Sequence, residues 1–182
     1  MFACSAAEGC KIDVIAIDWS GRARGAAAAI WLAHVRDGEL VALENGRERD
    51  GVVDHAIGLA RAQPRTVVGL DFSFSFPRWY CEREGWHSGR AVWDAMRDRG
   101  EELLAACEPP FWGRPGTRAQ TLGEPLRATE RACGAKSTFQ IGGAGAVGTA
   151  SIRGMPLLAR LAGAGLAIWP FDRPALPAVV EI

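Results

Sequence analysis

Lysine is nearly absent from this chain of 182 residues: only Lys11 and Lys136 occur, and arginine supplies the remaining basic side chains. Lys and Arg together number 21, as do Asp and Glu, so the formal net charge is zero. A zero net charge excludes a strongly basic protein that coats nucleic acid, although it leaves room for a local basic surface.

The chain also lacks Cys-x-x-Cys pairs, a basic leader followed by an apolar run, and any apolar run near the roughly 18 residues that span a bilayer. Its five cysteines, at positions 4, 10, 81, 107 and 133, are scattered. This spacing argues against a zinc ribbon and predicts free thiols in a reducing compartment. We therefore expect a cytoplasmic protein that does not enter a membrane. Its composition, 48% hydrophobic and 23% charged, is that of a globular domain.

Alternating apolar runs and turn signals predict the first half of the fold. A buried strand is expected over 11–18, an apolar run follows over 26–35, and a third short strand covers 39–44, all joined by short turns. Asp50 is the predicted N-cap of an amphipathic helix over 51–62, which Pro64 ends. The next strand, over 66–71, should lie parallel to the first, because crossovers through a helix are right-handed.

The second half is less regular. An irregular helical insertion is expected at about 78–140, with Ser88 capping one helix. A glycine-rich segment then leads into a helix that Pro156 should kink or divide, and strands are predicted over 166–169 and 178–182. We expect a single domain over 11–182 after an irregular lead over 1–10. Because the last strand stops one residue after an acid, we also expect the chain to be truncated.

Three acidic residues, Asp18, Asp71 and Glu181, each follow an apolar strand pattern. Neighbouring strands lie about 4.8 Å apart, so adjacent parallel strands would bring Asp18 and Asp71 side by side at one sheet edge. Two carboxylates at such a short distance repel each other unless one is protonated or a cation lies between them. Mg²⁺ or Mn²⁺ suits such oxygen ligands. Alternatively, each acid is only a solvated strand end or a helix cap.

The order of three antiparallel strands, a helix and a parallel strand is similar to the ribonuclease H-like fold, an α/β fold with a mixed sheet. The chain more closely resembles an uncharacterised family called domain of unknown function 429, whose members are regarded as predicted nucleases of that fold. The similar segments are 14–21, 67–77, 139–156, 168–172 and 179–182. The resemblance implies that Asp18, Asp71 and Glu181 are catalytic, metal-binding carboxylates. The family usually continues past the last acid with an aromatic residue and a proline, which this chain does not.

Other residues near the acids are candidates for substrate binding. The motif Gly143-x-Gly145-x-x-Gly148 matches a dinucleotide fingerprint only in letters, because it does not follow the first strand of a βαβ unit. Its glycines could instead let a helix N-terminus approach a phosphate, or let that helix pack closely on the sheet. The aromatics at 72, 74, 76, 79 and 86 suit either base stacking or core packing. The predicted substrate-binding residues are Ser20, Arg22, Ser73, Gly143, Gly145 and Arg153.

The expected function is therefore that of a Mg²⁺- or Mn²⁺-dependent nuclease or phosphodiesterase, which hydrolyses a phosphodiester through a metal-activated water. Its partner would be a nucleic acid or another phosphoester. Two alternatives stay open. One is an actin-like nucleotide-binding phosphotransferase, and the other is a non-catalytic module that binds nucleic acid or a small ligand. The sequence does not fix the oligomeric state.

Overall fold

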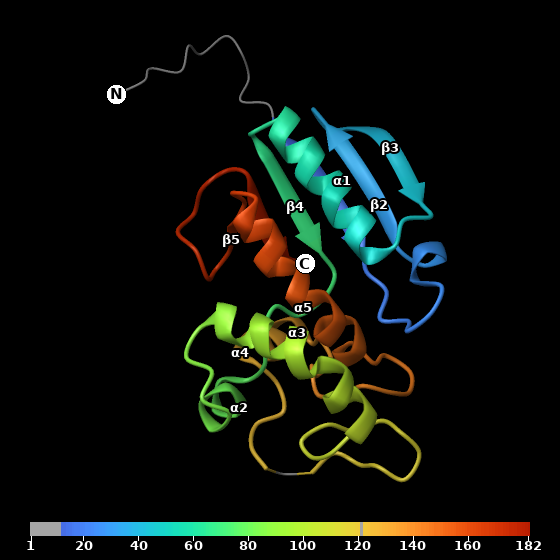
Figure 1. The fold of residues 1–182 in the computed structure, drawn as a ribbon, viewed down its shortest axis with the longest axis vertical. Coiled ribbons are helices and arrows are strands. Elements are labelled where there is room, and N and C mark those ends of the chain that lie inside the picture. The colour runs from blue at the N-terminus through green and yellow to red at the C-terminus, as the bar shows by residue number, and fades with distance from the viewer. Residues whose placement is uncertain (1–11, 121) are drawn as a thin grey trace.

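The computed structural model describes residues 12–120 and 122–182 as an α/β structure built on a six-stranded mixed sheet (Figure 1). The strands lie in the order β3-β2-β1-β4-β6-β5. The predicted mixed sheet with flanking helices is thus confirmed, whereas the predicted lead over 1–10 lies outside the described residues. The strands are β1 (Asp13–Asp18), β2 (Trp31–Arg36), β3 (Glu39–Asn45), β4 (Thr66–Leu70), β5 (Ala167–Ile168) and β6 (Ala178–Glu181).

The first half of the sheet follows the predicted pattern. Strands β1, β2 and β3 form antiparallel neighbours, and β4 pairs parallel to β1 with Ile17 opposite Leu70. Helix α1 (Arg49–Ala62) makes the crossover and buries Val52, Ala56 and other small apolar residues. The prediction of Asp50 as its N-cap is wrong. The cap is Glu48, and Asp50 lies in the first turn, where a carboxylate complements the helix dipole and forms an ion pair with an arginine of α5.

The second half adds helices α2 (Arg78–Arg83), α3 (Gly89–Ala106), α4 (Ala128–Cys133) and α5 (Gly148–Gly163). Ser88 caps α3 as predicted, because its hydroxyl accepts the backbone N–H of Ala91. Pro156 lies inside α5, which continues through it. Helix α3 packs against α5, and below the sheet they join a lobe that also holds α2 and α4 (Figure 1).

Aromatic rings fill the core of this lower lobe. Phe76 stacks on Phe139 with 5.8 Å between ring centroids, and Tyr80 meets both Phe111 and Phe139 edge to face. Phe72, Phe74 and Phe76 are all buried. Of the two interpretations of this aromatic run, core packing is therefore confirmed for these three phenylalanines, since a buried ring cannot stack on a base.

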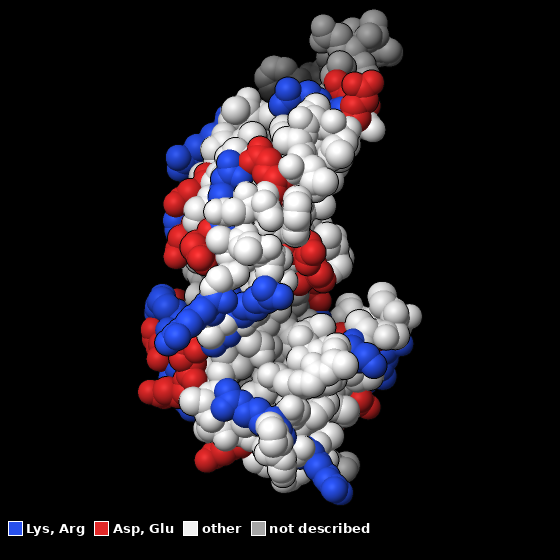
Figure 2. All heavy atoms as spheres, turned by 90° about the vertical axis from the view of Figure 1, so that its right-hand side faces the viewer, with Lys and Arg blue, Asp and Glu red and all other residues white. Residues whose placement is uncertain are grey.

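Over residues 12–120 and 122–182, the helices cover one face of the sheet and leave the other open. Along β1, Ile15 and Ile17 are buried beneath them, whereas Val14 on the opposite face is 41% exposed. The same open face carries exposed apolar side chains on β2 and β3, Trp31 and Leu43 among them. Figure 2 shows that Lys, Arg, Asp and Glu are intermixed on the surface, so neither sign dominates this view.

A buried ion pair lies at the opposite end of β1 from Asp18. Asp13 is 2% exposed, and its carboxylate contacts His34 Nε2 at 2.7 Å and Arg36 Nη2 at 3.0 Å. The hydrogen bond from Arg36 holds the pKa of Asp13 below its ordinary value, and it outweighs the opposing effect of burial, with His34 adding to the lowering. His34 therefore has a structural role in this pair.

Candidate functional site

Asp18 and Asp71 lie side by side where β1 and β4 end. The two strands pair in parallel up to Ile17 and Leu70, and the backbone N–H of Asp71 donates to the carbonyl of Ile17 at 3.1 Å. Both residues are exposed. Within 12–120 and 122–182, no hydrogen bond or ion pair neutralises either carboxylate. The prediction that the fold brings these two acids together is confirmed.

Electrostatics at this pair favour a cation. Although Asp71 is exposed, partial burial of its carboxyl raises the pKa of Asp71 above its ordinary value, and the neighbouring charge of Asp18 raises it further. A carboxylate whose pKa is raised by a like charge is stabilised when a cation binds between the two groups. The pair therefore fits a hard divalent ion such as Mg²⁺ or Mn²⁺, whose usual protein ligands are carboxylate oxygens.

The loop after β1 is braced from two helices. Arg49 of α1 donates to the carbonyl of Ser20 at 2.7 Å, and Arg153 of α5 donates to the carbonyl of Gly21. At Gly21 even a Cβ atom would come within 2.6 Å of the backbone nitrogen of Ala150. This loop and the start of α5 are therefore in direct backbone contact, which fixes the chain that follows Asp18.

The loop after β4 is anchored on the same helix end. The backbone N–H of Ser73 donates to the hydroxyl of Ser151 at 3.0 Å, and that hydroxyl donates to the carbonyl of Val147. The N-terminal turn of α5 therefore supports both loops that follow the acids, and it sets their relative position.

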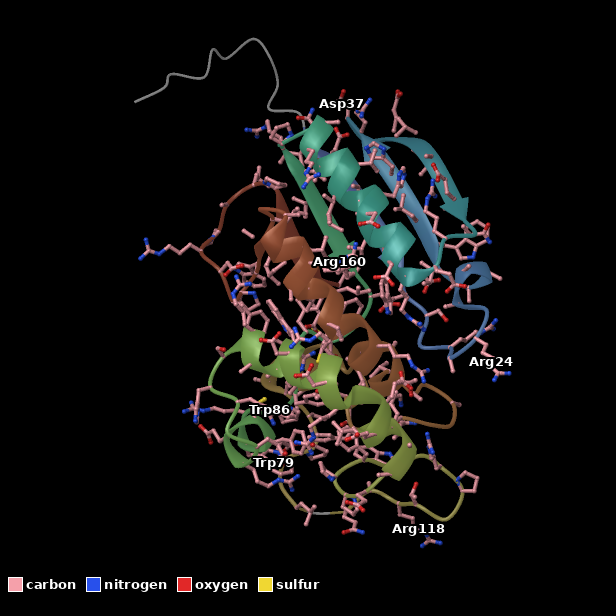
Figure 3. The ribbon with its side chains drawn as sticks, viewed as in Figure 1. Arg24, Asp37, Trp79, Trp86, Arg118 and Arg160 are labelled. Atoms are coloured by element: carbon pink, nitrogen blue, oxygen red, sulfur yellow. The ribbon has the colours of Figure 1, made fainter. Side chains whose placement is uncertain are left out.

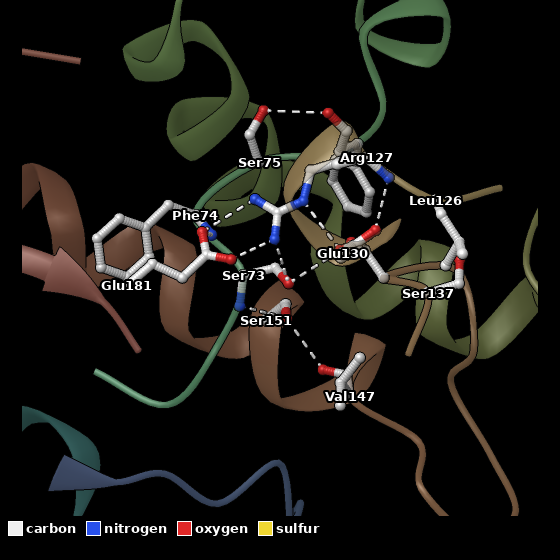
Figure 4. A network of polar contacts seen from close by, with 12 residues as sticks. Ser73, Phe74, Ser75, Leu126, Arg127, Glu130, Ser137, Val147, Ser151 and Glu181 are labelled. Carbon is white, nitrogen blue, oxygen red and sulfur yellow. Dashed lines mark hydrogen bonds and ion pairs between the residues drawn. The ribbon is translucent and has the colours of Figure 1, made fainter. Parts of the chain in front are cut away.

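Glu181 lies in a different environment from the other two acids (Figure 4). Both of its carboxylate oxygens accept hydrogen bonds from the Arg127 guanidinium, and Oε2 also accepts the backbone N–H of Phe74 at 3.0 Å. Burial lowers the pKa of Arg127, but its hydrogen bonds to Glu181 and its charge contacts with Glu130 outweigh burial and raise that pKa. Arg127 therefore stays charged and neutralises Glu181.

Glu130 completes this network from α4. Its carboxylate is buried and accepts from the backbone N–H and the Nε of Arg127, from Thr138 and from Ser73. A carboxylate with four donors is fully satisfied, so its role is to hold Arg127 in place. The i,i+3 spacing of Arg127 and Glu130 is a sequence signal for such a pair, which our sequence analysis missed.

A cavity of about 230 Å³ opens beside these groups. Three carboxylates, Asp71, Glu130 and Glu181, face two cations there, Arg127 and Lys136, so the lining of the cavity is net negative, and Asp18 is not part of that lining. Trp19 also lines it, and in the described part of the chain the Trp19 Nε1 is a buried donor without a hydrogen-bond partner. The wall is thus charged, and one of its polar groups is unsatisfied.

The three predicted metal ligands are not grouped together. Among the residues that the structure describes, no cluster of three or more His, Cys, Asp or Glu side chains could hold a metal ion. Glu181 belongs to the strand next to β4, yet its carboxylate is turned to Arg127. As positioned, Asp18 and Asp71 fit a divalent cation and Glu181 does not.

Of the six predicted substrate-binding residues, Ser73 lines the cavity and the other five do not. Ser73 accepts from Arg127 at 2.9 Å. Ser20 is buried and caps its own turn by accepting the N–H of Arg22, whose side chain is exposed. In Figure 3 the neighbouring Arg24 projects away from the tip of this loop, as expected of a solvated turn.

Gly143, Gly145 and Arg153 do not line the cavity. Arg153 pairs with Glu101 of α3 at 2.7 Å and serves as a brace. Gly143 and Gly145 have positive φ angles of 79° and 74°, so they make the turns that lead to α5, while Ala146 and Val147 form the cavity wall. The adjacent Gly148 lies so close to the Thr138 carbonyl that a Cβ would clash with it, so this glycine lets α5 pack closely on the loop over 138–141 rather than on the sheet.

Comparisons of the chain with protein-family models, with curated proteins and with solved structures found no match. Over the described residues, no helix combines the length and apolar character needed to cross a membrane. The interpretation of the site therefore depends on its own geometry and charge.

Proposed function

We propose that the protein is a divalent-metal-dependent phosphodiesterase or nuclease of ribonuclease H-like fold. The observation that carries this proposal is the pair of adjacent, unneutralised carboxylates, Asp18 and Asp71, at the carboxyl ends of two parallel strands. Ligands of open α/β sheets bind at this edge. We keep the cytoplasm as the proposed compartment, because the three described cysteines are free thiols.

In this proposal Asp18 and Asp71 hold Mg²⁺ or Mn²⁺. Such an ion, when bound, polarises a phosphoryl oxygen and lowers the pKa of a coordinated water. The exposed Lys136 lines the cavity and can bind a non-bridging phosphate oxygen. The N-terminal turn of α5 adds the positive end of a helix dipole. Arg127 keeps Glu181 and Ser73 in fixed positions on the cavity wall.

Glu181 as a third metal ligand stays a prediction. To serve in that role, its carboxylate would have to be released by Arg127, which binds both of its oxygens. The proposal needs only the Asp18–Asp71 pair, and it assigns Glu181 to the wall of the substrate cavity.

Replacement of Asp18 by Asn tests the function. The wild-type protein should cleave a fluorescent oligonucleotide or bis(p-nitrophenyl) phosphate with Mn²⁺ and lose this activity in EDTA. Asp18→Asn should lower the cleavage rate by at least about 100-fold, because one neutral amide replaces a charged ligand. Asp94→Asn, on the exposed side of α3, is the matched control and should keep the full rate. Undiminished cleavage by Asp18→Asn would refute the metal assignment.

A further inference from the structure

A second cavity, of about 340 Å³, adjoins the first one. Arg127, Glu130 and Glu181 border both cavities, so they form the wall between them. The far side of the second cavity is apolar and is made by Trp169, Pro170 and Phe171, which directly follow β5. The polar site thus continues into an apolar one without leaving the same edge of the sheet.

The topology explains why these residues meet. Strands β1, β4, β6 and β5 are parallel neighbours in that order, and all four end at the same edge. The last residues of these strands, or those just after them, are Asp18, Asp71, Glu181 and Trp169. Two strand spacings separate β4 from β5, which places Trp169 roughly 10 Å from Asp71 along the edge.

The aromatic turn is held rigidly. The backbone N–H of Asp172 donates to the carbonyl of Ile168 at 2.8 Å, and the Asp172 carboxylate accepts the N–H of Ile168 and pairs with Arg90 of α3. Phe171 packs edge to face on Trp93 with 5.4 Å between centroids. The backbone of the turn is therefore fixed by hydrogen bonds, and the Phe171 ring is packed against Trp93.

Trp169 nevertheless stays half exposed. Its relative accessibility is 51%, and that of Phe171 is 39%, although Phe72, Phe74 and Phe76 are buried. Trp169 also borders a third, apolar cavity beside Leu176 and Val180, so open space lies around its ring. Trp169, Phe171 and Leu176 thus expose apolar side chains together beside a polar pocket, and such a patch is typical of a ligand-binding surface.

We infer that Trp169 is a stacking platform for an unpaired base of a single-stranded nucleic acid, whose backbone phosphate lies at Asp18 and Asp71. This inference rests on the proposed phosphodiesterase function and names its substrate class. A paired base has both of its faces covered within a duplex, whereas an unpaired base offers its face to an aromatic ring. The span from Trp169 to Asp71 is one that a short stretch of single strand covers.

The test is a binding measurement in the Asp18→Asn background, with EDTA and low ionic strength, so that no cleavage occurs and one repelling carboxylate is absent. The probes are a fluorescein-labelled oligodeoxythymidylate and an abasic oligonucleotide of the same length and backbone. Trp169→Ala should raise the dissociation constant for the thymidylate about tenfold, because stacking depends on the ring. It should leave the abasic probe unaffected.

Two further variants separate stacking from general damage. Trp169→Phe keeps a ring and should retain most of the affinity, and Leu43→Ala removes a similarly exposed apolar side chain at the far edge of the sheet. A base-paired duplex probe should not respond to Trp169→Ala. Equal weakening of both single-stranded probes, no weakening of either, or no binding of the thymidylate would overturn the inference. If the wild-type protein shows base-dependent binding but no Mn²⁺-dependent cleavage, the proposed reaction alone is refuted.

Discussion

The ionisation of Asp71 is coupled to the candidate site through burial and through the charge of Asp18. Its native pKa lies above its ordinary value, so between those two values the native protein binds more protons than the unfolded chain. The contribution of Asp71 to stability therefore falls as the pH rises through that window. At neutral pH, without metal, the repulsion between Asp18 and Asp71 destabilises the fold.

Asp71→Asn should remove this repulsion. In EDTA at neutral pH we expect it to stabilise the protein by about 0.5 kcal/mol, a small gain because both groups are exposed to solvent. Added Mn²⁺ should raise the melting temperature of the wild-type protein and not that of Asp71→Asn, since ligand binding to the native state stabilises it. Thermal denaturation with and without Mn²⁺ measures both effects. An equal Mn²⁺ shift in the two proteins would contradict a site at this pair.

The acids at the strand ends could be predicted because their signal is local: an apolar run followed by a carboxylate. The side chains that bind these acids could not be predicted. Whether Asp71 or Glu181 receives an arginine depends on where α4 docks, and nothing near Arg127 in the sequence points to a contact with Glu181. The alternating aromatics at 72–76 gave two interpretations because core packing and base stacking favour the same residue types.

At the scale of elements, α5 joins the parts of the site. It supports the loop after β1 through Gly21 and Arg153, and the loop after β4 through Ser151. Its contact with the Phe72 ring requires the glycine at 154, where a Cβ would come within 2.6 Å of the ring. The hydrophobic spacing predicted this helix, but its contacts with both loops are tertiary and leave no sequence period.

Two helix glycines offer a matched comparison. Gly154→Ala should destabilise the protein by about 1–3 kcal/mol, because the buried Phe72 ring has to move. Gly58→Ala on α1 meets no atom within 4 Å and should stabilise it by about 0.5–1 kcal/mol through helix propensity. Urea denaturation gives both free energies of unfolding. If Gly154→Ala and Gly58→Ala changed the free energy of unfolding equally, or if Gly154→Ala stabilised the protein, the described packing of α5 on Phe72 would be contradicted.

At the scale of the molecule, the helices of the described part cover one side of the sheet, and the other side stays apolar and open. Parallel strands are normally covered on both faces. Val14, Trp31, Leu40 and Leu43 are each at least 40% exposed there. The apolar run over 11–18 predicted a buried strand, but it could not show that, in the described part of the chain, one face of the sheet has no helix over it.

This open face should bind a hydrophobic dye. The native protein is expected to enhance the fluorescence of 8-anilinonaphthalene-1-sulfonate, and the double substitution Leu40→Thr and Leu43→Thr should reduce that signal. Threonine suits exposed strands, so the free energy of unfolding should change by less than about 1 kcal/mol. Leu122→Thr, which removes an equally exposed leucine outside the sheet, is the control. An unchanged signal in the double variant would show that the dye binds elsewhere.

Because both acid-bearing loops depend on the first turn of α5, no single segment of the chain can reproduce the candidate site. Asp18, Asp71 and the helix that positions them come from three distant segments, and none of these segments sets the spacing of the carboxylates by itself. A peptide that carries one segment would hold an acid without its counterpart. The proposed cation affinity would therefore depend on the assembled tertiary structure, and it should vanish cooperatively when the chain unfolds.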